Sequence, residues 1–187
     1  MWRIHRADQD AMFYGGEDVN YRFNDPGAGA AHPDTPSPYG DSEWDEGAYG
    51  VCYLGLSPAT AFVETFLRRP ARRDLALAEI EARRLTPVRV RRELRLVQLD
   101  GEGLRRAGVD ATVVSGSDYA LSRAVSRLLW RRGDAPDGVL YAARHDNHLY
   151  AAAVFDRARA SLKARAPEPI SDDLLRQLIR RYQFGLL

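Results

Sequence analysis

The alternation of apolar and polar residues divides this chain into several short extended segments. Residues 1–6 alternate as a half-buried strand does, and residues 51–54 form an apolar run typical of a buried strand. Residues 138–143 and 149–155 predict two further strands, joined by a polar turn over residues 144–148. The pattern therefore predicts short strands drawn from both halves of the chain.

Other segments follow helical spacing and carry helix-start signals. A helix is expected after Ser57, because this serine can cap it and Pro58 then stands at the first helical position. Residues 118–132 predict a second helix, which Ser117 or Asp118 can cap and which a glycine ends. A third, amphipathic helix is expected over residues 172–183, capped by Ser171.

The remaining segments are less periodic. Residues 74–83 and 87–99 favour extended structure, although a helix also fits the first of them, and residues 101–108 predict a short helix. Residues 25–46 are rich in Gly, Pro, Ala, Asp and Ser, which predicts a long loop that is either functional or mobile. Because helices do not follow each strand, we expect one mixed α+β domain over residues 1–187 rather than a doubly wound sheet.

Composition narrows the class of protein. A length of 187 residues fits one domain, and a net charge of +1 implies no strong attraction to nucleic acid or membrane. Cys52 is the single cysteine, so it forms no internal disulfide and completes no metal motif. No stretch approaches membrane-spanning length, and no apolar signal core follows the N-terminus. We therefore expect a soluble cytoplasmic protein.

Several familiar kinds of site are disfavoured. No Gly-x-Gly-x-x-Gly, Walker or Gly-x-Ser-x-Gly pattern occurs, which argues against Rossmann, P-loop and α/β-hydrolase sites. His145, Asp146 and His148 fall in one polar turn. A metal site needs three or four ligands and partners that orient them, so a polar hairpin tip is the better interpretation and no metal is expected.

The stretch from residue 49 to residue 64 holds the most specific pattern. An apolar strand leads into the helix start at Ser57, and that helix carries one carboxylate, Glu64. Glu64 lies off the apolar stripe of its helix, so it can border a cleft without entering the core. Tyr53 is expected at the end of the strand, whereas Cys52 faces the other way and packs in the core.

Together with two N-terminal motifs, this stretch resembles the RES-domain family of bacterial toxins that act on NAD. The motifs are Trp2-Arg3-Ile4-His5 and Tyr21-Arg22-Phe23-Asn24, and the resemblance extends to about Arg157. It implies a split, twisted sheet similar to that of ADP-ribosyltransferases, with an NAD cleft between the halves of the sheet.

The resemblance also implies roles for particular residues. Glu64 would stabilise the cationic, sugar-centred transition state that forms when nicotinamide leaves ribose. Arg3 and Arg22 would bind the phosphates through bidentate, charge-assisted hydrogen bonds, with Arg3 and Tyr53 counted among the catalytic residues. Tyr53 would stack on the nicotinamide or adenine ring. The alternatives, from the residues alone, are a solvated glutamate, surface arginines and a core tyrosine.

One position departs from the family pattern. Related sequences carry Tyr-x-Ser-Arg after the long helix, and this chain reads Tyr141-Ala142-Ala143-Arg144, so Ala143 replaces the serine. The change implies weakened activity, a shifted specificity or an engineered inactive form. Ser122 on the preceding helix could supply a hydroxyl and so bind NAD instead; an ordinary helix serine is the alternative.

Three functions follow from these observations. The first is a toxin that cleaves NAD by hydrolysis or phosphorolysis. An Xre-like antitoxin would inhibit it, and the toxin would contact nucleic acid only through this antitoxin. The second is an ADP-ribosyltransferase that modifies a specific protein acceptor. The third is an inactive binding domain, supported by the missing serine and by helices rich in arginine: Arg123, Arg127, Arg131, Arg132, Arg176, Arg180 and Arg181.

Overall fold

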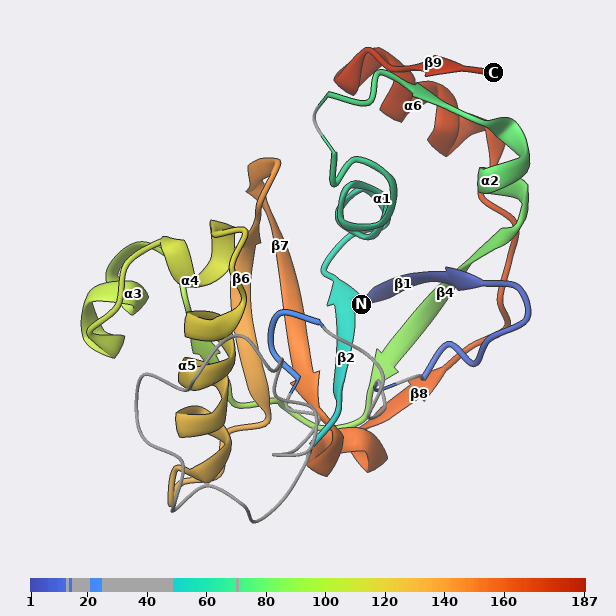
Figure 1. Cartoon of the computed structure of the whole chain (residues 1–187). Helices are drawn as coiled ribbons and strands as arrows, with labels where there is room; N and C mark the ends of the chain where they lie inside the picture. The colour runs from blue at the N-terminus through green and yellow to red at the C-terminus, as the bar shows by residue number, and fades with distance from the viewer. Residues whose placement is uncertain (13, 15–20, 25–48, 70) are drawn as a thin grey trace, which may run out of the picture.

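The structure is a computed structural model that describes residues 1–12, 14, 21–24, 49–69 and 71–187. The loop expected over residues 25–46 lies outside the described residues. In the part that is described, the chain forms a mixed α+β domain built on one principal sheet (Figure 1). This arrangement confirms the predicted fold class.

The principal sheet has seven strands in the order β5-β6-β7-β2-β1-β4-β8. Every neighbouring pair is antiparallel except β5 and β6. A parallel pair of short strands, β3 and β9, brings the C-terminus beside the segment after α1. The strands are β1 (Trp2–Arg6), β2 (Val51–Gly55), β3 (Asp74–Leu75), β4 (Arg83–Val90), β5 (Leu96–Gln98), β6 (Gly138–Ala143), β7 (Asp146–Phe155), β8 (Leu162–Ala164) and β9 (Gly185–Leu186).

The helices gather in two groups (Figure 1). One group, α3, α4 and α5, lies beside β6, and the other, α1, α2 and α6, lies around β1 and β4. Separate apolar cores lie under each group, one joining α5 to β2, β6 and β7 and the other joining α1 and α6 to β1 and β4. The helices are α1 (Pro58–Phe66), α2 (Leu77–Glu81), α3 (Gly101–Ala107), α4 (Thr112–Ser115), α5 (Ala120–Arg131), the 3₁₀ helix η2 (Asp156–Ser161) and α6 (Asp172–Tyr182).

The sheet opens between its two central strands. β1 and β2 are joined at one register pair, Trp2 with Gly55, whereas β1 pairs with β4 over five residues and β2 with β7 over five. Figure 1 shows β1 turning away from β2 beyond this point. The two halves of the sheet therefore diverge, as the expectation of a split sheet requires.

Helix α1 begins where its sequence signals predict. The Ser57 hydroxyl accepts a hydrogen bond from the Thr60 N–H at 3.1 Å, and Pro58 occupies the first turn, where its missing N–H costs nothing. Gly55 lets the end of β2 approach this turn closely, because a Cβ there would lie 2.5 Å from the Ala61 nitrogen. The helix buries Phe62 and Phe66 and leaves Glu64 half-buried.

Helices α5 and α6 were also predicted, with one difference. Ser171 caps α6 by accepting from the Leu174 N–H, as expected. The N-cap of α5 is Tyr119, and neither Ser117 nor Asp118 holds that position, although the Asp118 carboxylate accepts from the Ala120 N–H.

The extended predictions hold only in part. Residues 74–83 are divided between the short strand β3 and helix α2, so the helix that also fitted this segment is present over Leu77–Glu81, where Ile80 packs into the core. The turn between β6 and β7 is shorter than expected, since β7 begins at Asp146 and a register shift between Ala142 and Ala143 brings Ala143 opposite it. None of the described helices is both long enough and apolar enough to cross a membrane.

An ion pair between a buried aspartate and an exposed arginine joins the start of β6 to the segment before β5. The Asp137 carboxylate, whose side chain is 6% exposed, accepts two hydrogen bonds at 2.7 Å from the Arg92 guanidinium and one at 2.9 Å from the Arg95 N–H. The hydrogen bonds from Arg92 outweigh the opposing effect of burial and lower the pKa of Asp137.

We expect this pair to make the free energy of unfolding depend on pH in the acidic range. A carboxylate whose pKa is lowered by folding contributes stability that is complete above its unfolded pKa, about 4, and is lost as pH falls through the folded pKa. Asp137→Asn should therefore cost about 1–2 kcal/mol at pH 7 and less as the pH falls below about 4. Urea unfolding at several pH values measures this, with the exposed Asp173→Asn as control. An equal cost at pH 7 and pH 3 would contradict the assignment.

Candidate active site

A cleft of about 300 Å³ lies where the two halves of the sheet diverge. Side chains from β1, β2, α1, β4 and β6 line it. Among the described residues that line it, Glu64 is the one carboxylate, and four arginines share the lining: Arg3, Arg22, Arg68 and Arg83. The cleft therefore carries excess positive charge around a single acid, which suits an anionic ligand.

Glu64 is held at the cleft by a tyrosine from the opposite wall. The Tyr141 hydroxyl donates to Glu64 Oε2 at 3.3 Å. Burial, reinforced by the charge of Glu64, raises the pKa of Tyr141 well above its ordinary value, so this hydroxyl stays protonated. Tyr141 was singled out in the sequence only as part of a strand motif, since a contact across 77 residues has no local signal.

Tyr53 also lines the cleft, but from the middle of β2 and not from its end. Its hydroxyl accepts a hydrogen bond from the Phe23 N–H at 2.7 Å, and burial raises the pKa of this phenol. Its ring stands edge-on to Tyr21, with 5.7 Å between the ring centroids. The two tyrosines form an aromatic wall, while the Tyr53 hydroxyl holds the backbone at Phe23.

Arg22 is anchored rather than free. Its Nη2 donates to the Gly116 carbonyl at 2.9 Å and its Nη1 to the Val113 carbonyl at 3.3 Å, and its guanidinium lies 4.6 Å from the centre of the Tyr119 ring. Burial lowers the pKa of Arg22 from a high starting value, and the nearby tyrosines oppose this. Arg22 therefore ties the segment between α4 and α5 to the cleft wall.

Ser122 stands behind Arg22 and not in the cleft. It is fully buried, its hydroxyl donates to the Val113 carbonyl at 2.5 Å, and Arg22 Nη1 lies 3.4 Å from its oxygen. The expectation that Ser122 contacts NAD is revised accordingly, because a hydroxyl enclosed by protein cannot reach a ligand. Its geometry fits the support of Arg22 instead.

Arg3 reaches the cleft from β1, but its Nη1 is directed toward Cys52 and not into the cleft. Its Nη1 donates to Cys52 Sγ at 2.8 Å. Cys52 is fully buried in the core on the face of β2 opposite Tyr53, as predicted, and burial raises the pKa of its thiol. This contact directs the Arg3 guanidinium away from the face that carries Tyr53.

Arg68 and Arg83 were missed in the sequence. Arg68 lies just beyond the end of α1, and Arg83 begins β4. A weak signal existed for the first, because Arg68 follows Glu64 by four residues and so shares its side of a helix. Nothing local distinguished Arg83 from the other arginines, since the pairing of β1 with β4 brings it to the cleft.

Ala143, the position where the family pattern has a serine, is enclosed by protein and is not among the residues that line the cleft. Ala143 is buried at the end of β6, two residues after Tyr141. Asp146, opposite Ala143, accepts hydrogen bonds from the Tyr182 hydroxyl at 2.6 Å and from Arg181 at 2.8 Å, so it fastens the hairpin to α6. No described group of three or more His, Cys, Asp or Glu side chains is placed to hold a metal ion.

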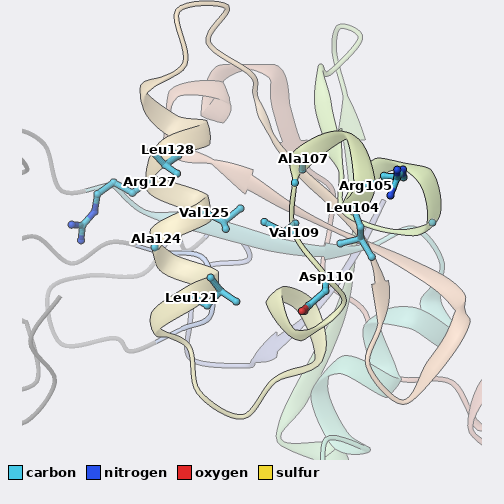
Figure 2. A pocket seen from close by; sticks show the side chains of 12 residues that line it. Leu104, Arg105, Ala107, Val109, Asp110, Leu121, Ala124, Val125, Arg127 and Leu128 are labelled. Carbon is cyan, nitrogen blue, oxygen red and sulfur yellow. The ribbon is translucent and has the colours of Figure 1, made fainter. Parts of the chain in front are cut away.

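A second hollow, of about 890 Å³, lies between α3 and α5 (Figure 2). Figure 2 shows Val109 and Val125 directed toward each other across it, with Arg127 projecting away on the outer side of α5. Its lining side chains are mostly aliphatic and include neither an aromatic ring nor a hydroxyl among the described residues. The larger hollow therefore has fewer side chains that could bind a nucleotide than the cleft around Glu64 has.

Fold and site together define a class: an α+β domain with a split sheet and a carboxylate set among arginines in the opening. The sequence matches the RES domain family over residues 1–176, and the chain belongs to that family. It is 26% identical over 98 residues to Probable toxin y4kH of Sinorhizobium fredii (strain NBRC 101917 / NGR234), a match covering 52% of this chain and 76% of that protein.

A solved structure shares the fold. The chain resembles one in the crystal structure of the M. tuberculosis MbcT-MbcA toxin-antitoxin complex with a TM-score of 0.65. The likeness covers 95% of this chain and 86% of that chain at 20% sequence identity. At this identity the likeness concerns the fold.

Proposed function

We propose that this chain is the toxin of a toxin-antitoxin system and that it cleaves NAD at the bond between nicotinamide and ribose. The observation that carries the proposal is Glu64, which Tyr141 contacts and which is the one carboxylate among the described residues of a cleft that also holds four arginines. Membership of the RES domain family and similarity to a probable toxin support it.

The reaction requires a negatively charged side chain beside the ribose, because the ribose becomes positively charged in the transition state. As the bond from the ribose anomeric carbon to the nicotinamide nitrogen breaks, its electron pair leaves with nicotinamide and the ribose becomes cationic. The Glu64 carboxylate stabilises this cation, and the hydrogen bond from Tyr141 keeps the carboxylate in position. Tyr21 and Tyr53 offer rings against which a flat base can pack.

The acceptor is then water or phosphate. Attack of a water oxygen on the anomeric carbon, with loss of one proton, yields ADP-ribose, and attack of a phosphate oxygen yields ADP-ribose carrying a phosphate on that carbon. A protein side chain in the same place would make the chain an ADP-ribosyltransferase. We favour the small acceptors, and identification of the products distinguishes the three cases.

We further propose that the partner is an Xre-like antitoxin that covers this cleft. A protein that destroys NAD in the cytoplasm needs such an inhibitor, and contact with nucleic acid would pass through it. The MbcT-MbcA structure, whose fold this chain shares, is itself a toxin-antitoxin complex.

Incubation of the purified chain with NAD, with and without phosphate, tests the proposal. We expect free nicotinamide together with ADP-ribose or its phosphorylated form. Ala143→Ser, which restores the hydroxyl of the family pattern at a buried position, is assayed in parallel. Ala142→Ser on the neighbouring, half-buried position is the matched control. Product analysis by mass spectrometry distinguishes the acceptors. Intact NAD with both the native chain and Ala143→Ser would contradict the proposal, and label retained on a protein would favour the transferase.

A further inference from the structure

The reaction described above assigns no role to the arginines of the cleft. Arg68 and Arg83 both line the cleft, the first exposed and the second half-buried. Within the part of the chain that the structure describes, no hydrogen bond or ion pair occupies either guanidinium. The charge of Arg83 does reach Glu79, but Arg72 already binds that carboxylate through two hydrogen bonds. Both guanidinium groups therefore retain their donors for a ligand.

The other two cleft arginines are already engaged. Arg22 donates to two backbone carbonyls, and Arg3 donates to the Cys52 thiol. A phosphate that bound either of them through those nitrogens would have to replace interactions inside the protein. Binding at Arg68 and Arg83 requires no such exchange, so these two residues are the better anion site.

The position of Arg68 relative to Glu64 also fits a dinucleotide. The two residues are four apart, and the Leu67 N–H still bonds to the Val63 carbonyl, so the helical path continues to the residue before Arg68. Four residues of helix advance about 6 Å, close to one turn. In NAD the diphosphate is attached to the 5′ carbon of the ribose that carries nicotinamide. A ribose at Glu64 therefore places its diphosphate at about this separation.

We propose that Arg68 and Arg83 form the subsite for the substrate's diphosphate, an inference that rests on the proposed function. Each guanidinium can present two parallel N–H groups to phosphate oxygens, a geometry that lysine cannot reproduce. The pair binds and orients the dinucleotide, and neither residue touches the bond that breaks. With the phosphates held there, the anomeric carbon is directed toward Glu64.

Calorimetric titration of the full chain with ADP-ribose tests the subsite without requiring turnover. The variant is Arg68→Gln combined with Arg83→Gln. The matched control, Arg69→Gln combined with Arg89→Gln, removes the same charge from exposed positions that do not line the cleft. We expect the Kd for ADP-ribose to rise at least about tenfold in the variant and to change less than about twofold in the control. Inorganic pyrophosphate should compete with ADP-ribose for the native chain.

The outcomes separate this inference from the proposed reaction. Equal affinity in the native chain and the variant, an equal loss in the control, or no binding of ADP-ribose by the native chain would overturn the subsite. Loss of binding confined to the variant supports it, even if the native chain leaves NAD intact; the reaction alone would then be withdrawn. Thermal unfolding verifies that each variant is folded, and either single substitution repeats the test with half the charge change.

Discussion

Replacing Glu64 by glutamine should reduce NAD cleavage by at least about a hundredfold. Glutamine keeps the size and shape of the side chain and removes its charge, so the cleft is unchanged while the sugar cation loses its stabilising partner. Glu64 is the one carboxylate among the described residues that line the cleft, which also include four arginines. No neighbouring described acid can take its place.

The loss should appear in kcat more than in KM. The charge that Glu64 stabilises exists in the transition state and not in bound NAD, and an interaction made only in the transition state lowers kcat when it is removed. Initial rates of nicotinamide release over a range of NAD concentrations measure both constants. The Arg68 and Arg83 pair should show the opposite division, since it binds the ground state and the transition state alike.

Glu102→Gln provides the control for this prediction. Glu102 is an exposed helix carboxylate paired with Arg106 and lies outside the cleft, so its replacement removes the same charge without touching the site. Both variants are compared in the native and the Ala143→Ser backgrounds, so that a low basal rate does not hide the effect. A Glu64→Gln enzyme that keeps more than about a third of the activity would show that the carboxylate is not part of the chemistry.

The elements that could be predicted are those with signals inside a few residues. Ser57 and Ser171 cap helices because a hydroxyl and the N–H it satisfies are three positions apart in the chain. Cys52 lies in the core because alternation along a strand assigns it a face. The same local reasoning predicted Glu64 at the border of a cleft, because Glu64 does not belong to the apolar stripe of its helix.

The interactions that could not be predicted join distant parts of the chain. Arg22 binds carbonyls more than 90 residues away, so no local pattern shows that it supports the fold. Ser122 was weighed as a ligand-binding hydroxyl, yet the packing of α5 encloses it. Arg83 enters the cleft through the register between β1 and β4, and Arg3 turns to Cys52 across the opening of the sheet.

Replacing Arg22 by alanine should destabilise the protein by about 2–4 kcal/mol. The substitution removes charge-assisted hydrogen bonds to Val113 and Gly116 and the stacking against Tyr119, while the Val113 carbonyl keeps its hydrogen bond from the Ser122 hydroxyl. A hydrogen bond from a charged donor contributes about 1.5–3 kcal/mol. Urea denaturation with a shared m-value measures the loss.

Two further variants show whether the cost belongs to the geometry of Arg22 or to its charge. Arg22→Lys keeps the charge but cannot reach two carbonyls from one planar group, so it should recover part of the stability and not all of it. Arg105→Ala removes an exposed arginine and should change stability by less than about 0.5 kcal/mol. If Arg22→Ala unfolded at the same urea concentration as Arg105→Ala, the hydrogen bonds between Arg22 and the α4–α5 segment would contribute nothing to folding. Arg22 would then be available to a ligand, and the division between two anchored and two ligand-binding arginines would have to be redrawn.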